Sequence, residues 1–201
     1  MLGAGLGIDT ARQLTASEPH MLAEAGCGFA CRYVTGVPGS TLTKAEAHAI
    51  SRAGLAIVSV FETMGNHAAY FTTAQGAKDG RQAAAAAEEA GQTGGHIFVA
   101  VGYDVQPGDL PALKGYLAAF SVGVGKHFAA GVYGSAALED LGYPLWQAGA
   151  TGWSGGRLSP RARIVQLPPP LMQTTFAGVH DVDVDVAMSP LHDLGWHLPL
   201  L

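Results

Sequence analysis

The chain has 201 residues and a formal net charge of −5; 48% of its residues are hydrophobic and 13% are charged. This composition is typical of a globular protein and excludes a disordered chain, so we expect a single domain over residues 1–201. No run of lysine and arginine is present, so we expect no nucleic-acid partner. No apolar run reaches the roughly 18 residues that a membrane-spanning helix needs.

The first residues and the cysteines predict two further absences. The opening MLGAGLGIDT has no basic region before a long apolar core, so we expect no signal peptide in this chain. The two cysteines, Cys27 and Cys31, have no histidine at zinc-ligand spacing, and two ligands do not make a zinc site. We expect both to be buried free thiols, with no metal site and no cofactor. The sequence leaves the oligomeric state open.

Short apolar runs alternate along the chain with longer segments of helical pattern. The strand candidates are residues 6–10, 29–34, 55–62, 96–104, 127–135, 145–150, 162–167 and 182–188. The helix candidates are residues 15–26, 41–54, 72–91, 108–125 and 136–142, and the later helices are expected to be short or missing. Thr43 and Glu46 have the spacing of a capping box, and Gly54 and Gly91 are expected to end their helices.

The strand candidates are apolar throughout, which is typical of strands buried on both faces of a parallel sheet. The repeated alternation of strand and helix predicts an α/β fold, a (β/α)8 TIM-type barrel in one compact domain. A doubly wound open sheet is the alternative. We prefer the barrel because polar residues recur near the carboxyl ends of the strands, which meet at one face. These residues are Asp9, Glu62, Asp104, Ser135, Asp183 and Asp185.

Four of these acids, Asp9, Glu62, Asp104 and Asp183, come from four different strands. Hydrolysis of a glycosidic bond needs one carboxyl group to protonate the leaving oxygen and a second to attack the sugar or activate water. Asp185 shares a strand face with Asp183, since side chains repeat every two residues. Both are expected to point into the barrel, where Asp185 would bind the substrate. A single acid at a strand end is more often a loop cap or an ion-pair partner.

Aromatic side chains near the same strand ends are candidates for stacking on a sugar ring: Tyr33, Tyr103, Tyr133 and Trp153. Other chemistry has less support. The segment GVGK at 123–126 does not match the phosphate-binding pattern, because Phe120 stands where a glycine is required. Ser135 lacks the flanking glycines of a nucleophilic serine turn, so serine hydrolysis is set aside.

Several segments together resemble a known family: GIDT at 7–10, RYVTG at 32–36, LTKAEAHAISRAGLAIVSVFE at 42–62, IFVAVGYD at 97–104, GVYGS at 131–135, WQAGATGWSGG at 146–156 and VDVDVA at 182–187. They resemble the glycoside-hydrolase-like domain of unknown function found in actinobacterial secreted proteins, a barrel akin to glycoside hydrolase family 25 lysozymes. The resemblance implies a (β/α)8 barrel that acts on peptidoglycan or another polysaccharide. It also implies an extracellular or cell-envelope location; without it the chain would be expected in the cytoplasm.

The resemblance also implies roles for individual residues. Asp104 matches the proton donor of the fourth-strand motif, and Asp9, Asp183 and Glu62 match further acids of the site. The family carries another acid two residues before the proton donor, where this chain has Gly102. We therefore expect a glycoside hydrolase with Asp104 as general acid and Asp9 or Asp183 as the second carboxylate. The alternative is a barrel that binds glycan but has lost activity at Gly102.

Overall fold

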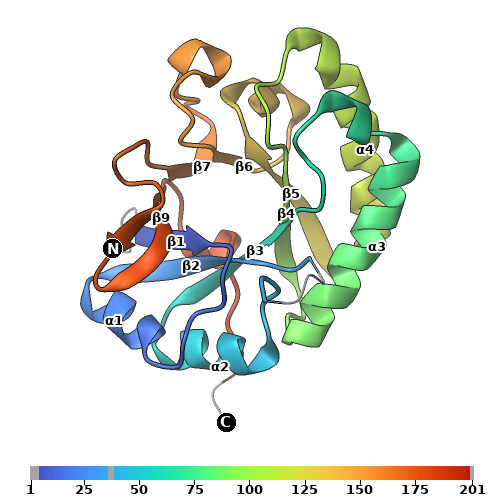
Figure 1. The fold of residues 1–201 in the computed structure, drawn as a ribbon. Helices are drawn as coiled ribbons and strands as arrows, with labels where there is room; N and C mark the ends of the chain where they lie inside the picture. The colour runs from blue at the N-terminus through green and yellow to red at the C-terminus, as the bar shows by residue number, and fades with distance from the viewer. Residues whose placement is uncertain (1–4, 36–38, 200–201) are drawn as a thin grey trace.

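A closed barrel of eight strands forms the centre of the computed structural model, which describes residues 5–35 and 39–199 (Figure 1). Seven strands run parallel in chain order, and the eighth closes the ring by pairing antiparallel with both the seventh and the first. The barrel strands are β1 (Leu6–Thr10), β2 (Cys27–Tyr33), β3 (Ala56–Phe61), β4 (Gly95–Ala100), β5 (Phe128–Gly134), β6 (Leu145–Gln147), β7 (Ala162–Gln166) and β9 (Val179–Ala187). A further short strand, β8 (Thr174–Phe176), pairs only with β9 among the described residues.

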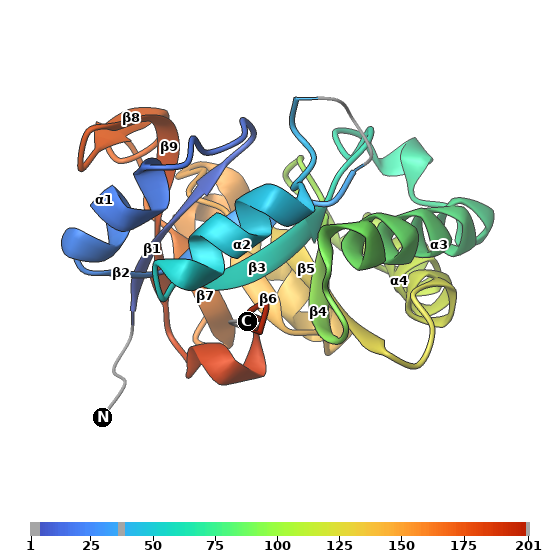
Figure 2. The same ribbon diagram turned by 90° about the horizontal axis from the view of Figure 1, so that it is seen from below.

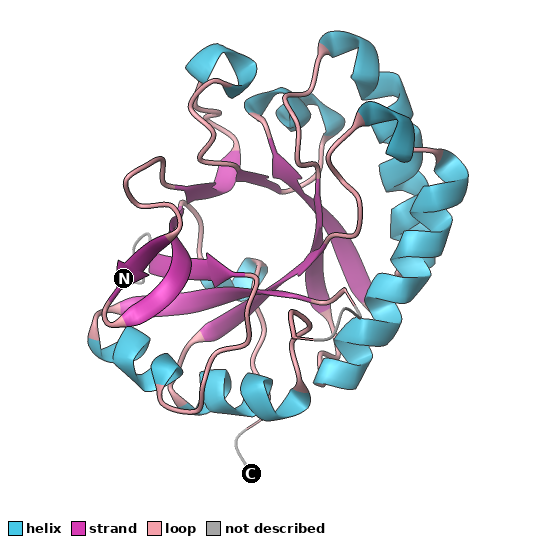
Figure 3. Cartoon of the chain, in the orientation of Figure 1, coloured by secondary structure: helices cyan, strands magenta, loops and turns pink. Residues whose placement is uncertain are grey.

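Helices cover the first half of the barrel, as Figure 3 shows. They are α1 (Glu18–Glu24), α2 (Lys44–Arg52), α3 (Thr73–Ala90) and α4 (Leu110–Gly123), which follow β1, β2, β3 and β4. The later connections carry only single-turn or short 3-10 helices, including Ala136–Leu141 and Trp153–Gly156. The predicted α/β barrel with short or missing last helices is therefore confirmed. In the described part of the chain, no helix has the length and apolarity to cross a bilayer.

The antiparallel closing strand is a departure from a regular (β/α)8 barrel. A parallel return would need a crossover of about a dozen residues or more, usually with a helix. The chain between β7 and β9 instead forms a loop and the β8–β9 hairpin, so β9 enters from the carboxyl end of β7. As a result the first residues of β9, rather than its last, lie at the face where β1–β7 end.

Local sequence signals explain the helix ends. Thr72 caps α3 by accepting a hydrogen bond from the backbone N–H of Gln75 at 3.1 Å, and Gly91 ends it with a left-handed backbone at φ 96°. Thr43 likewise accepts from the N–H of Glu46 at 3.2 Å. The predicted capping box is only half formed, however, because the Glu46 carboxylate turns to the guanidinium of Arg32 instead.

Arg32 and Glu46 form an ion pair that is almost fully buried between the barrel and α2. The Arg32 Nε atom donates to Glu46 Oε1 at 2.7 Å, and the two side chains are 0% and 4% exposed. Arg32 also donates to the carbonyl oxygens of Thr10 and Ser40, and Glu46 accepts from the Leu14 N–H at 2.9 Å. The pair thus ties the ends of β1 and β2 to α2.

The strands pack against two apolar clusters, one on each face of the barrel sheet. The larger lies between the strands and the helices, and the smaller fills the barrel interior with side chains such as Phe29, Val58, Phe98 and Ile164. Both cysteines are buried free thiols, as predicted, and Cys31 belongs to the interior cluster. The 3-10 turn Leu191–Asp193 lies at the end of the barrel where β1 begins (Figure 2), and the adjacent Leu194 packs into the interior cluster. The opposite end, where strands β1–β7 end, carries the candidate active site.

Candidate active site

The closing strand brings acids from the two ends of the sequence together. Asp9 in β1 lies directly opposite Asp183 in β9, and Gly7 lies opposite Asp185. The side chains of Asp183 and Asp185 share the inward face of β9 with Ala187, which belongs to the interior cluster. The sequence prediction that both acids point into the barrel therefore agrees with the strand register.

Gln166, at the end of β7, links two of these acids. Its Nε2 atom donates to Asp9 Oδ2 at 2.8 Å and to Asp183 Oδ2 at 2.7 Å. Its Oε1 atom accepts from the Tyr133 hydroxyl at 2.9 Å and from the Gly149 N–H at 3.0 Å. These four bonds fix the orientation of the amide, with its two hydrogens directed at the carboxylates. The sequence analysis missed Gln166, although a glutamine at the end of the apolar run ARIVQL was a usable signal.

Asp185 lies one step deeper in the barrel than Asp9 and Asp183. Its side chain has no exposed surface, and its Oδ1 atom accepts from Trp146 Nε1 at 2.8 Å. It was predicted to bind substrate, but it lines none of the cavities described below. Its contact is instead with the Asp9 carboxyl group, which lies within hydrogen-bonding reach. Trp146, on β6, is a second site residue that the sequence analysis did not single out.

Glu62 follows β3 and occupies space beside Gly102. A Cβ atom added to Gly102 would lie 3.5 Å from Glu62 Oε1, so Glu62 stands next to the position where the family carries an acid. The Glu62 carboxylate lies close to the Tyr33 hydroxyl, and Tyr33 borders the same space as Asp9 and Asp183. An acid from the neighbouring strand therefore lies where residue 102 provides none.

The Asp104 carboxylate contacts the loop after β6 and the amide of Gln106. Strand β4 ends at Ala100, four residues before Asp104, so the prediction of a strand running to Asp104 is wrong and strand periodicity does not orient residues 102 and 104. The chain turns off here, with the Gly102 N–H donating to the Gly65 carbonyl at 2.7 Å. Asp104 Oδ1 accepts from the Ser154 N–H at 2.8 Å, which anchors the loop after β6. Its role as general acid stays a prediction.

The four aromatic candidates divide into two pairs. Tyr33 and Tyr133 border the space around Asp9 and Asp183. Tyr103 instead packs on Phe71 in the layer outside the barrel, with ring centroids 6.0 Å apart, so its ring is not presented to the acids. Trp153 lies in the loop after β6 and borders a third hollow of about 280 Å³ beside β7, which shares Gln166 with the space around Asp9 and Asp183.

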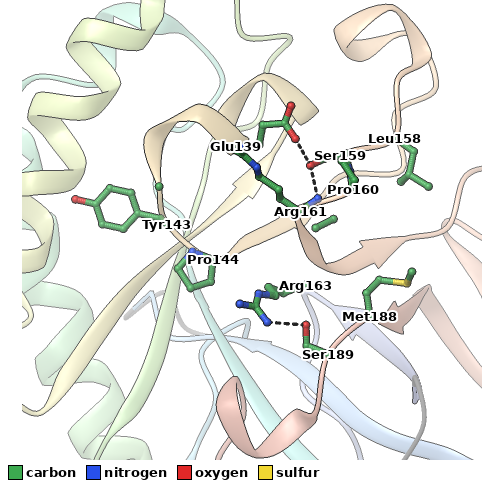
Figure 4. A pocket seen from close by; sticks show the side chains of 12 residues that line it. Glu139, Tyr143, Pro144, Leu158, Ser159, Pro160, Arg161, Arg163, Met188 and Ser189 are labelled. Carbon is green, nitrogen blue, oxygen red and sulfur yellow. Dashed lines mark hydrogen bonds between the residues drawn. The ribbon is translucent and has the colours of Figure 1, made fainter.

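Two connected hollows lie over the acids. The outer one, of about 580 Å³, is lined by residues of β1, β2 and β9 and of the loops after β1 and before β8: Asp9, Thr10, Ala11, Tyr33, Gln173, Asp181 and Asp183. The inner one, of about 70 Å³, shares Asp9, Tyr33 and Asp183 and reaches down to Trp146. The outer hollow has the size of a small-molecule site. A larger groove of about 900 Å³ lies at the other end of the barrel, around Arg161, Arg163 and Met188 (Figure 4).

Burial changes the acid–base properties of the whole group. Desolvation and the negative charge of Asp183 raise the pKa of Asp9 to about 7. Desolvation also raises the pKa of Asp183 and of Glu62 above their ordinary values. The pKa of Asp185 is raised well above its ordinary value, first by burial and then by the charge of Asp9. A carboxyl group that holds a proton near neutral pH beside a more exposed carboxylate is the arrangement of an acid–base pair.

In the described residues, no group of three or more histidine, cysteine, aspartate or glutamate side chains has the arrangement of a metal site. The arrangement that is present combines a buried carboxyl group, a more exposed carboxylate, a bridging amide and two tyrosines beneath an open hollow. Such a site can donate a proton to a bound oxygen and stabilise positive charge that develops next to it.

Comparison with known proteins identifies the family. The model of the Rv2525c-like, glycoside hydrolase-like domain matches residues 20–187. The chain belongs to this family. The resemblance found in the sequence is thus confirmed. The protein FadG of Bacillus subtilis is 30% identical over 168 residues, which are 75% of this chain and 29% of FadG. The chain therefore spans less than a third of FadG.

Solved structures show the same fold. Rv2525c of Mycobacterium tuberculosis, a Tat-secreted protein solved in complex with L-tartrate, superposes with a TM-score of 0.76 at 22% identity, covering 94% of this chain and 97% of that one. A lysozyme from Streptomyces coelicolor has a TM-score of 0.61 at 14% identity, covering 96% of both chains. A family 25 glycosyl hydrolase of Streptococcus pneumoniae gives the same TM-score at 13% identity. The barrel is thus shared with family 25 lysozymes.

Proposed function

We propose that the chain hydrolyses glycosidic bonds in peptidoglycan or a related cell-wall polysaccharide. The observation that carries this proposal is the pair Asp9 and Asp183, joined by the Gln166 amide beneath an open hollow of about 580 Å³. The lysozyme fold of the structural relatives supports the substrate class. The secreted relative Rv2525c supports a location outside the cytoplasm or in the cell envelope.

In this proposal Asp9 donates the proton to the leaving oxygen. Its pKa of about 7 keeps a proton on it under mildly acidic conditions, and it borders both hollows, so a bound sugar can reach it. Asp183 is more exposed and faces the sugar as the second carboxylate. Glu62 orients Tyr33, which lines the hollow, and supplies negative charge at the position beside Gly102. Asp104 holds the loop after β6, and the role of general acid that the resemblance implies for it is the alternative to Asp9.

The geometry of the pair predicts that the product keeps the configuration of the substrate. Asp9 Oδ2 and Asp183 Oδ2 both accept from Gln166 Nε2, at 2.8 Å and 2.7 Å. The distance between these two oxygens therefore cannot exceed the sum of the two hydrogen-bond distances. Retaining enzymes separate their carboxyl groups by about 5–5.5 Å, whereas inverting enzymes need about 6.5–9.5 Å for an intervening water. We expect proton NMR of the first products to show retained anomeric configuration. Inversion would assign the second carboxylate to a more distant group such as Glu62.

A glycan-binding barrel without activity is the second candidate, and Gly102 favours it. The family acid is missing there, and Asp104 is engaged by the Ser154 N–H. Against it stands Glu62, whose carboxylate fills the neighbouring space.

Reducing-end release from purified peptidoglycan tests the two candidates together. Wild-type protein and Asp9→Asn, purified identically, are incubated with insoluble cell wall, and reducing ends and sedimented protein are both measured. A hydrolase releases reducing ends only in the wild-type sample, while both proteins sediment with the wall. Sedimentation of both without reducing ends identifies a binding protein, and neither signal rejects a cell-wall substrate.

A further inference from the structure

Asp9, Asp183 and Asp185 form one network that contains few hydrogen-bond donors, and two of its members, Asp9 and Asp185, are buried. Gln166 supplies one donor to Asp9 and one to Asp183, and the Gln173 N–H donates to the other oxygen of Asp183. Asp185 receives one bond, from Trp146 Nε1. Its second oxygen, Oδ2, is buried and has no donor among the described residues. A buried carboxylate oxygen without a donor is unfavourable, so the ionised form of Asp185 is poorly stabilised.

The positive charge of Arg32, near the network, is already paired with another group. Arg32 is the cation that acts on Asp9, but its guanidinium is bound to Glu46 and to two backbone carbonyls on the other side of β2. If Asp9 and Asp185 were both ionised beside Asp183, the two buried carboxylates would therefore lack a counter-charge. At least one of them must carry a proton for the group to be buried at acceptable cost.

The contact between Asp9 and Asp185 locates that proton. The two carboxyl groups lie within hydrogen-bonding reach of each other, and two ionised carboxylates can only accept. The contact is thus a hydrogen bond only if one of them is protonated. Asp185 has no exposed surface, whereas Asp9 borders the hollow and has the Gln166 amide as a donor. The deeper group, with the unsatisfied oxygen, is the better place for the proton.

We propose that Asp185 permanently holds a proton and donates it in a hydrogen bond to Asp9, which makes Asp185 a positioning residue for the carboxyl group at the hollow. The role in catalysis rests on the proposed function, because Asp9 is the proton donor there, but the location of the proton does not. Held by Asp185 below and by Gln166 beside it, Asp9 keeps one orientation and presents its free face to the substrate.

Other titratable groups face this pair from the elements around it. They are Cys31, Arg32 and Tyr33 of β2, Tyr133 of β5 and Asp183 of β9. Cys31, Tyr33 and Tyr133 have raised pKa values through burial and nearby acids, so they stay neutral in the working range. Asp183 adds the repulsion that raises the pKa of Asp9, and Arg32 opposes it. Asp9 is therefore the member of the pair that titrates near pH 7.

Carboxyl carbon NMR of aspartate-labelled protein tests the proposal directly, without any substrate. In the wild type we expect one aspartate carboxyl that remains protonated from pH 4 to pH 9, and a second that titrates near pH 7. The first signal should be missing in Asp185→Asn and the second in Asp9→Asn. A wild-type spectrum in which every aspartate carboxyl is ionised by pH 9 overturns the proposal, whether or not the protein cleaves glycan.

Two replacements at residue 185 separate the neutral from the ionised form. Asparagine copies a protonated aspartate, because its amide can donate to Asp9 while its oxygen accepts from Trp146. In Asp185→Asn we therefore expect the pKa of Asp9 to change by less than about half a unit. Were Asp185 ionised, the same replacement would remove a like charge and lower the pKa of Asp9 by about one unit or more. Asp185→Leu removes the group that donates to Asp9, so we expect this replacement to raise the pKa of Asp9.

The pH dependence of stability gives a second readout. Because the pKa values of Asp9 and Asp185 are raised in the folded protein, the folded state binds more protons than the unfolded chain above pH 4. Their contribution to stability is complete below their unfolded pKa values. The part from Asp9 is lost as the pH rises through about 7, and the part from Asp185 goes on falling at higher pH. We expect the wild-type Tm to fall over this interval and the fall to be smaller in Asp185→Asn. An equal fall in both proteins contradicts a proton on Asp185.

Discussion

Replacing Asp9 by asparagine is expected to lower glycan turnover by about 10²–10⁴-fold while the protein stays folded. Asparagine has nearly the same shape and can still accept from the Gln166 amide, but it has no proton to give to a leaving oxygen. The measurement is the initial rate of reducing-end release, with the thermal unfolding midpoint and cell-wall binding recorded for the same preparations.

Asp104→Asn is the comparison that decides which acid donates the proton. The asparagine oxygen can still accept from the Ser154 N–H, so the loop after β6 should keep its anchor. We expect this variant to keep most of the wild-type turnover, because Asp104 lines neither hollow above Asp9 and Asp183. The opposite result, with Asp104→Asn inactive and Asp9→Asn active, would restore the assignment expected from the family motif.

The buried ion pair should give the largest effect on stability. In Arg32→Met the Glu46 carboxylate stays buried between the barrel and α2 without its counter-charge, and the carbonyl of Thr10 loses its donor. Breaking such a pair from one side costs about 3–5 kcal/mol, which is a large part of the stability of a typical domain. Urea unfolding followed by circular dichroism measures this difference.

Arg161→Met is the matched control for that measurement. Arg161 pairs with Asp140 at 3.9 Å, but both side chains are 69% exposed, and exposed pairs contribute little. We expect its unfolding midpoint to stay close to that of the wild type. Similar midpoints for Arg32→Met and Arg161→Met would show that the buried pair does not brace β1 and β2 against α2.

Much of the fold could be predicted from local patterns. The first strand, 6–10, matches its prediction at both ends, and the long helix expected over 72–91 is observed as Thr73–Ala90 with its threonine cap and glycine end. Apolar runs and turn residues act over a few positions, so they are readable along the chain. The fourth strand was predicted to end at Asp104, four residues beyond its observed end at Ala100. The pattern of HIFVAVGYD does not reveal that the Gly102 N–H donates to the carbonyl of Gly65.

The candidate site was predictable only in part. The inward direction of Asp183 and Asp185 follows from the two-residue period of a strand, and it holds because both lie inside β9. The same argument failed for Asp104, which lies beyond the end of β4. Tyr103 was named for its place near a strand end, yet it packs on Phe71. Trp153 borders a hollow that shares Gln166 with the space around the acids, and its role stays a prediction.

By itself the sequence determined the α/β barrel class, the family, and the set of acids from which a site could be built. Only the tertiary structure decided which of them meet. Asp9 and Asp183 are 174 positions apart and become neighbours because β9 closes the barrel antiparallel to β1. Gln166 and Trp146 gained their roles in the same way, as donors to acids on other strands. Contacts across a closed barrel depend on strand register and direction, and no local pattern in the chain records either.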